Sequence, residues 1–306
     1  MKIAVTSHSV SKHPVLRKEI DAFFPGSVFN ESKGKPSNED VIGFLNGCDG
    51  AIVGLEIIDE VVLKECPRLE IISKYGVGLD NLDMDACKRH GVEIGWTPGV
   101  NKLSVAELTL GFMLALLRNI VSGCEDLKHG EWKKYGGAEL SGKTVGIIGV
   151  GNIGKEVIRL LKPFNCRILG NDIAEMAAYY EANNIEGVSK EKIFSEADII
   201  TLHVPLTALT ENLINRNTLS AMKKTAFLIN TARGAVVNKT DLKWALSNNV
   251  IAGAAVDVYP VEPETELDFL RLPNLICTPH RGGSSKEAVL AMGMSAIGHL
   301  RKYFKK

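Results

Sequence analysis

The chain has 306 residues, of which 45% are hydrophobic and 24% charged, and its 36 basic side chains balance 36 acidic ones. This length allows two domains, each with its own hydrophobic core. A formal net charge of zero gives no support to binding of nucleic acid or of an anionic membrane surface.

Neither a signal peptide at the N-terminus nor a membrane helix is expected. The apolar run near the N-terminus is only a few residues long, which is too short for a signal peptide. The longest apolar stretch, residues 108–117, falls far below the ~20 residues of a membrane helix. We therefore expect a cytoplasmic protein without a membrane partner. The cysteines form no C-x-x-C pair and no histidine stands at metal-ligand spacing, so we predict reduced thiols and no metal site.

The first third of the chain alternates short β-branched runs with amphipathic segments. Such strict alternation predicts βαβ units and a parallel sheet. The expected strands cover 2–7, 27–29, 50–54, 69–76 and 92–96, and the expected helices cover 14–24, 38–45, 59–66 and 83–90.

A long helix over 104–119 follows, with Ser104 as its N-cap and Glu107 completing a capping box. The polar, glycine-rich stretch after it suits a surface excursion or an interface arm. A second series of apolar runs then begins, and a helix over 284–306 ends the chain. The runs cover 143–149, 166–172, 198–204, 226–232, 251–258 and 275–280. The pattern predicts the α/β class, with two doubly wound parallel-sheet domains.

The run at 143–149 leads into Gly149-x-Gly151-x-x-Gly154 at the start of a helical pattern. In a dinucleotide site the first glycine permits a tight turn, the second admits the pyrophosphate, and the third allows close packing of helix and strand. The next run ends at Asp172, eighteen residues after Gly154, where an acid would bond the ribose hydroxyls. A carboxylate there repels a 2′-phosphate, so the motif predicts NAD(H) as the cofactor.

Three polar residues stand at or just beyond the ends of strands predicted in the second series: Arg233, Glu262 and His280. Because the carboxyl ends of parallel strands meet at one edge, we expect them near the nicotinamide. His280 would donate the proton needed at a developing alkoxide, and Glu262 would orient and charge its imidazole. Arg233 would grip a substrate carboxylate. Each residue also has a purely structural alternative, such as capping a strand or lying in a solvated loop.

Together these motifs resemble the D-isomer-specific 2-hydroxyacid dehydrogenases, and the resemblance covers nearly the whole chain. It implies a flavodoxin-like substrate domain, residues 1–100 completed by 285–306, and a Rossmann NAD-binding domain, residues 101–284, with a cleft between them. The segments that carry it are GVGNIG, HVPLTALTENLI, INTARGAVVN, AAVDVYPVEP and TPHRGGSSKEA, with SKYGVGLDNLDMDAC and TPGVNKLSVAELTLGFMLALLRN before them.

The resemblance also implies roles for single residues. It assigns catalysis to Arg233, Glu262 and His280, and the substrate carboxylate to Arg233 and a glycine turn at Gly76, Val77 and Gly78, with Lys74 close enough to reach a phosphate. Implied cofactor contacts are Thr97, Gly149, Gly151, Asn152, Ile153, Gly154, Asp172, Val204, Thr231, Ala232, Asp257 and Gly283. A homodimer is expected by analogy alone.

The substrate is a small 2-hydroxy or 2-oxo acid, with 3-phosphoglycerate as first choice because the GVGLDN turn and SVAELT helix match phosphoglycerate dehydrogenases most closely. Lys74 departs from the arginine that such proteins often carry, and Trp96 from the small polar residue usual before TPG. Glyoxylate, hydroxypyruvate and lactate are the alternatives within the family. Outside this substrate class, an NAD(H)-sensing module of the corepressor type also stays open. A formate or phosphonate dehydrogenase is disfavoured, because the GVG turn and Lys74 suit an organic carboxylate with a second polar or charged end.

Overall fold

The computed structural model describes residues 1–32 and 36–305 and divides the chain into two compact units. The N-terminal unit comprises Met1–Asn101 and Gly283–Lys306, and the central unit comprises Lys102–Gly282. The sequence analysis places the two domain boundaries after residues 100 and 284, whereas the units of the structure divide after Asn101 and Gly282. The predicted end of the last helix, Lys306, lies outside the described residues.

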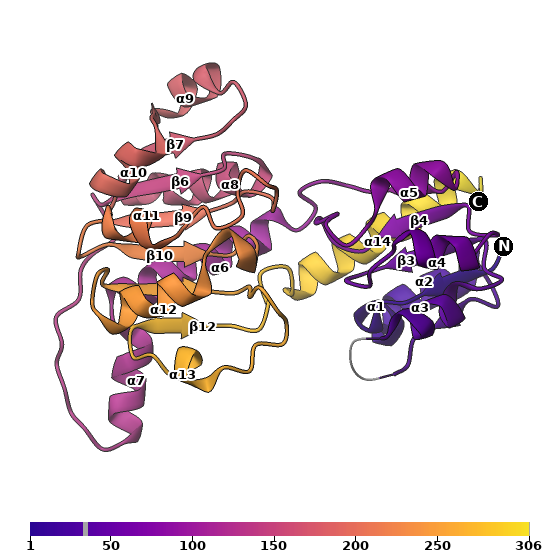
Figure 1. Ribbon diagram of the computed structural model, residues 1–306, viewed down its shortest axis with the longest axis horizontal. Helices are drawn as coiled ribbons and strands as arrows, with labels where there is room; N and C mark the ends of the chain where they lie inside the picture. The colour runs from indigo at the N-terminus through magenta and orange to yellow at the C-terminus, as the bar shows by residue number, and fades with distance from the viewer. Residues whose placement is uncertain (33–35, 306) are drawn as a thin grey trace. The chain divides into compact units, whose positions relative to one another are not determined.

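The N-terminal unit is built on a parallel sheet of five strands in the order β2-β1-β3-β4-β5. This is the flavodoxin-like order, as predicted. Figure 1 shows β3 and β4, which pair with each other, side by side. The strands are β1 (Ile3–Val5), β2 (Val28–Phe29), β3 (Gly50–Val53), β4 (Ile71–Lys74) and β5 (Glu93–Gly95). Their helices are α1 (His8–Lys12), α2 (Pro14–Phe23), α3 (Asn38–Leu45), α4 (Glu60–Glu65), α5 (Met84–Arg89) and, from the C-terminal segment, α14 (Lys286–Tyr303).

Alternation along the strands sends neighbouring side chains into two separate cores. Ala51 and Val53 pack with α3, α4 and α5, whereas Ile52 between them packs with α2 and α14. Both faces of the sheet are therefore covered, which explains why its strands are apolar throughout rather than alternating with polar residues.

The central unit holds a parallel sheet in the order β12-β11-β10-β9-β6-β7-β8. Counted from β6, this is the Rossmann order with one further strand, and the direction of winding reverses between β6 and β9. The strands are β6 (Thr144–Ile148), β7 (Arg167–Asn171), β8 (Glu186–Gly187), β9 (Ile199–Leu202), β10 (Phe227–Asn230), β11 (Gly253–Val256) and β12 (Leu275–Cys277). The sequence patterns predicted all of these except β8.

Helices cover both faces of this sheet. Helix α6 (Lys102–Leu117) and α8 (Asn152–Leu161) share one core with Ile147, while Ile148 faces the core of the opposite helices. The opposite helices are α10 (Lys190–Glu196), α11 (Arg216–Ser220), α12 (Lys239–Ser247) and α13 (Leu267–Leu270). The unit also contains α7 (Ile120–Lys128), α9 (Ala177–Asn183) and the short turns η1 (Lys162–Phe164) and η2 (Gly234–Val236).

The predicted start of the long helix is wrong. Ser104 lies inside α6, not before it, and its hydroxyl donates to the Gly282 carbonyl at 2.6 Å instead of capping the helix. That tertiary acceptor is distant in sequence, so a local capping pattern could not reveal it.

Among the described residues no single helix is long and apolar enough to span a membrane; only the bent pair α6 and α7, taken together, has the length and composition.

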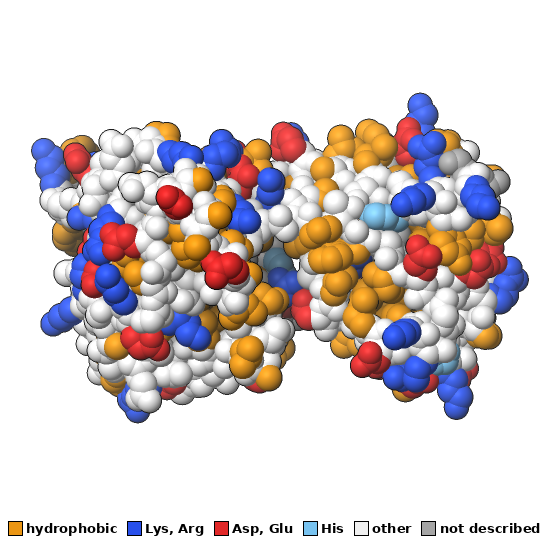
Figure 2. Space-filling model, turned by 90° about the horizontal axis from the view of Figure 1, so that it is seen from above, with side chains coloured by type: hydrophobic (Ala, Val, Ile, Leu, Met, Phe, Trp, Pro, Cys, Tyr) orange, Lys and Arg blue, Asp and Glu red, His pale blue; other side chains and the backbone are white. Residues whose placement is uncertain are grey.

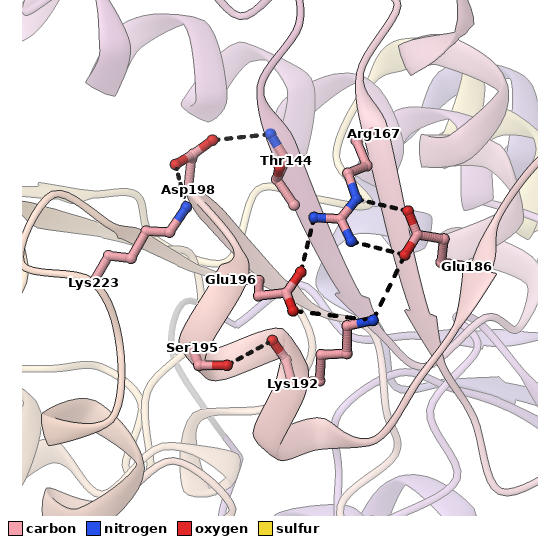
Figure 3. Close-up of polar contacts among 8 residues, drawn as sticks. All are labelled: Thr144, Arg167, Glu186, Lys192, Ser195, Glu196, Asp198 and Lys223. Carbon is pink, nitrogen blue, oxygen red and sulfur yellow. Dashed lines mark hydrogen bonds and ion pairs between the residues drawn. The ribbon is translucent and has the colours of Figure 1, made fainter.

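Charged side chains at the amino edge of the larger sheet neutralise one another (Figure 3). Arg167 forms two parallel bonds to Glu186, at 2.6 and 2.8 Å, and a third to Glu196 at 2.8 Å. Asp198 accepts from the Thr144 N–H and the Lys223 amine, both at 2.9 Å. Acidic and basic side chains also lie next to one another on the face in Figure 2, as the balanced composition leads one to expect.

Candidate active site

The loop after β6 has the geometry of a pyrophosphate cradle. Gly149 has a φ of +94°, and a Cβ there would lie 2.5 Å from the His203 carbonyl oxygen. A Cβ on Gly154 would lie 2.2 Å from the Gly149 carbonyl oxygen, whereas one on Gly151 would meet nothing within 4 Å. The first and third glycines therefore allow close packing, and the second leaves open space at the N-terminus of α8, where N–H groups attract anions.

Asp172 lies at the end of the neighbouring strand β7 and faces this loop. Its carboxylate accepts from the Val150 N–H at 2.6 Å and from the Ala174 N–H at 2.8 Å. These bonds fix a negative charge beside the glycine loop, which suits ribose hydroxyls and disfavours a 2′-phosphate. The residues present therefore fit NAD.

Arg233 follows β10 and owes its position to the next residue. A Cβ on Gly234 would lie 1.9 Å from the Tyr259 carbonyl carbon, so only glycine lets the two segments pass this closely. The Arg233 guanidinium donates to the Ala232 carbonyl at 2.7 Å. Its positive charge helps to lower the pKa of Glu262, so the two side chains lie within electrostatic reach.

His280 and Glu262 form a hydrogen-bonded pair, with 2.8 Å between Nδ1 and Oε2. This bond raises the pKa of His280, against the effect of desolvation. Burial acts to raise the pKa of Glu262, but His280 and the Tyr259 N–H lower it overall. The pair therefore favours an imidazolium beside a carboxylate. His280 has a left-handed backbone with φ +51°, and its N–H donates to the Asp257 carbonyl at 2.8 Å.

Asp257 holds the segment that carries His280. Its carboxylate is 1% exposed and accepts from the Thr278 hydroxyl at 2.5 Å and from the Arg281 and Gly282 N–H groups, both at 2.7 Å. A carboxylate has about four acceptor positions, so one is left for the carboxamide contact that the resemblance implies. The sequence did not reveal Thr278 or the positioning role of Asp257. The residues that bond each other here lie on different loops, so they form no local sequence pattern.

The structure places most of the other implied cofactor residues along the same edge. Asn152 and Ile153 begin α8, Val204 follows β9, and Thr231 and Ala232 follow β10. The Thr231 hydroxyl lies 3.1 Å from that of Thr109 in α6. Two residues do not belong to this unit, since Thr97 and Gly283 lie in the N-terminal one.

Within the N-terminal unit, Thr97 forms hydrogen bonds to side chains of α14, and the glycine turn forms one to the Trp96 side chain. The Thr97 hydroxyl lies 2.8 Å from His299 Nε2 and accepts from the Ser295 hydroxyl at 2.7 Å. The turn Gly76, Val77 and Gly78 follows β4, and the Trp96 indole donates to the Val77 carbonyl at 3.1 Å. Trp96 thus fixes the turn expected to bind the substrate carboxylate, a role that the sequence left undefined.

Lys74, at the end of β4, points into the unit. It is 4% exposed, and its amine donates to the Gly54 carbonyl and, at 2.7 Å, to the Asn81 side-chain oxygen.

Over residues 1–32 and 36–305, no group of three or more His, Cys, Asp and Glu side chains is arranged to hold a metal ion.

Comparison with known proteins identifies the family. Residues 110–282 match the sequence model of the D-isomer specific 2-hydroxyacid dehydrogenase, NAD binding domain. The chain belongs to this family. The match confirms the predicted family, and with it NAD as the cofactor.

Its relatives differ in the substrates for which they are named. The chain is 38% identical over 271 residues to D-3-phosphoglycerate dehydrogenase of Methanocaldococcus jannaschii, covering 87% of this chain but 52% of that protein. It thus spans about half the length of that relative. It is 38% identical over 246 residues to hydroxypyruvate reductase of Thermotoga maritima, covering 79% of each. The D-lactate dehydrogenase structure of Escherichia coli is 30% identical, with a TM-score of 0.84 over 100% of this chain and 97% of that one.

Proposed function

We propose that this protein is an NAD-dependent oxidoreductase that interconverts a small D-2-hydroxy acid and its 2-oxo acid. The observation that carries the proposal is the His280–Glu262 pair, with Arg233 within electrostatic reach, at the carboxyl edge of the sheet whose first loop has the pyrophosphate-cradle geometry. These three residues follow the adjacent strands β10, β11 and β12, so the fold converges them at one place. Packing alone does not require an ion pair there.

Each residue has a defined task in the reduction. NAD, when bound as NADH, supplies the hydride for the carbonyl carbon. His280 donates a proton to the carbonyl oxygen through Nε2, while Glu262 holds Nδ1 and so fixes the ring and its charge. Arg233 binds the substrate carboxylate through its planar guanidinium. In the N-terminal unit, the N–H groups of the glycine turn 76–78 are the proposed substrate contact. In the reverse direction His280 accepts the proton.

The placement of Lys74 changes the order of the candidate substrates. The GVGLDN turn and the SVAELT helix favour phosphohydroxypyruvate, with Lys74 expected close enough to reach its phosphate, and this substrate would connect the reaction to serine biosynthesis. Because the Lys74 amine is turned toward Gly54 and Asn81, hydroxypyruvate and glyoxylate now come first. Pyruvate and phosphohydroxypyruvate follow.

The test is NADH oxidation against a panel of hydroxypyruvate, glyoxylate, pyruvate, phosphohydroxypyruvate and a bulky branched 2-oxo acid. We expect turnover of the small acids that His280→Ala abolishes while NADH still binds. NADH binding without turnover of any 2-oxo acid would contradict the proposed reaction and favour a dinucleotide-sensing role.

A homodimer is a second part of the proposal, and α7 with the arm after it supports it. None of the α7 residues is buried, yet Ile120 and Leu127 are apolar and more than half exposed. Trp132 and Tyr135 in the arm are 78% and 58% exposed. Apolar surface of this kind is typical of an interface between subunits. Light scattering should give twice the chain mass, and Leu127→Ser combined with Trp132→Ser should reduce it to one.

A further inference from the structure

The loop after β3 buries an acid between two exposed hydrophobic residues. Leu55 and Ile57 are 68% and 46% exposed, whereas Glu56 between them is 8% exposed. This pattern is the reverse of what hydrophobicity favours, because a carboxylate loses hydration on burial and is retained only where bonds compensate it. The inward position of Glu56 therefore needs a specific reason.

Glu56 and Lys74 are bound to the same residue. The Gly54 N–H donates to Glu56 Oε2 at 2.7 Å, and the Gly54 carbonyl accepts from the Lys74 amine. The Thr6 hydroxyl lies 2.8 Å from the same Glu56 oxygen. Asn81 completes the cluster, since its side-chain N–H₂ donates to the Glu56 carbonyl at 2.5 Å while its oxygen accepts from Lys74. One buried cation and one buried anion thus share a single network.

This network lies where the substrate turn begins. Gly54 follows β3 directly, and the turn 76–78 follows the neighbouring strand β4 by two residues. A phosphate dianion bound here would need a cation with donors directed at it. Lys74 instead donates to Gly54 and Asn81, and the same two residues join it to the buried Glu56.

We infer that Glu56 is a specificity-determining residue, which selects 2-oxo acids with an uncharged distal group over those with a distal phosphate. Its buried carboxylate, joined to Lys74 through Gly54 and Asn81, opposes a second anion next to the substrate turn. The inference rests on the proposed function and names the substrate class of that site.

The test compares hydroxypyruvate with phosphohydroxypyruvate, since the two differ only by the phosphate. For the wild-type protein we expect kcat/KM at least about tenfold higher for hydroxypyruvate. Glu56→Gln keeps an oxygen acceptor for Gly54 but removes the charge, and should raise kcat/KM for phosphohydroxypyruvate by about tenfold with little change for hydroxypyruvate. Glu65→Gln, at the exposed end of α4, removes the same charge and should leave both values unchanged.

A binding measurement separates this inference from the proposed reaction. With NAD⁺ present, which has no hydride to give a 2-oxo acid, hydroxypyruvate should raise the Tm of the wild-type protein more than phosphohydroxypyruvate does, and Glu56→Gln should reverse or abolish that order. Equal kcat/KM and equal Tm shifts for both acids in the wild type, or an unchanged ratio in a folded Glu56→Gln variant, would overturn the inference. Binding in the expected order without turnover of either acid would overturn the proposed reaction alone.

Discussion

The two edges of the larger sheet use charged side chains for different purposes. At the amino edge, Arg167, Glu186 and Glu196 bond one another on the surface. At the carboxyl edge, His280 and Glu262 form a partly buried pair, with Asp257 fixing the backbone that carries His280. The difference is one of positioning: the first set stabilises strand ends, while the second holds side chains in place for a reaction. Substitutions at the two edges should therefore separate activity from stability.

The largest effect should come from His280→Ala. Without the proton donor, kcat/KM for 2-oxo acid reduction should fall by about 10²- to 10⁴-fold. The dissociation constant of NADH, measured by fluorescence, should stay nearly the same. Glu196→Gln at the amino edge serves as the control and should leave both values unchanged. An equal loss of NADH affinity and turnover in His280→Ala would argue against the acid–base role.

A smaller but diagnostic effect should come from Glu262→Gln, measured as a pH profile of kcat/KM for reduction. The reaction needs protonated His280, whose pKa Glu262 raises above 6.5. In the wild type the rate should be constant at low pH and fall as pH rises through this raised pKa. In Glu262→Gln the fall should begin at a lower pH, because the negative partner that raises the His280 pKa is gone. An unchanged profile would show that another group sets the His280 pKa.

The next effect concerns the cofactor. Asp172→Asn keeps an oxygen acceptor for the Val150 N–H but removes the charge beside the glycine loop. We expect about tenfold weaker NADH binding and a reduced preference for NADH over NADPH. Titration of both cofactors by fluorescence measures this directly. A preference that stays as in the wild type would exclude Asp172 as the ribose ligand.

Trp96→Phe should have an effect of only a few fold. Phenylalanine keeps an aromatic, though smaller, ring, but the N–H that holds the Val77 carbonyl is lost, so the glycine turn 76–78 becomes less well fixed. We expect KM for the 2-oxo acid to rise by roughly threefold while kcat stays the same, because a net hydrogen bond contributes about 1 kcal/mol. A change in kcat instead would place Trp96 closer to the reacting atoms.

Most of the fold could be predicted because the signals are local. The glycine pattern at 149–154 follows from the close approaches that a side chain would prevent, and buried parallel strands are visible as apolar runs. Side-chain partners distant in sequence could not be predicted. Ser104 bonds Gly282 rather than capping a helix, and Lys74 turns toward Asn81 rather than outward. Strand β8 was missed because its two residues, Glu186 and Gly187, carry no apolar pattern.

The smallest effect should come from Asp198→Asn at the amino edge, and it should be on stability alone. Burial acts to raise the pKa of Asp198, but the Thr144 N–H and the Lys223 amine lower it overall. A carboxyl whose pKa is lowered by folding stabilises the protein above its unfolded pKa and loses that contribution as pH falls through the folded value. At pH 7 the variant should lose about 1 kcal/mol of unfolding free energy in urea, because asparagine has one acceptor oxygen for the two donors and carries no charge.

That loss should shrink as the pH is lowered below about 4, since the wild-type carboxyl is then protonated as well. Throughout, kcat/KM should match the wild type, in contrast to every substitution at the carboxyl edge. A pH-independent loss would mean that the side chain acts through its shape and not its charge. A loss of activity at pH 7 would mean that the two edges are coupled through β9, which begins at the residue after Asp198 and ends beside the cofactor loop.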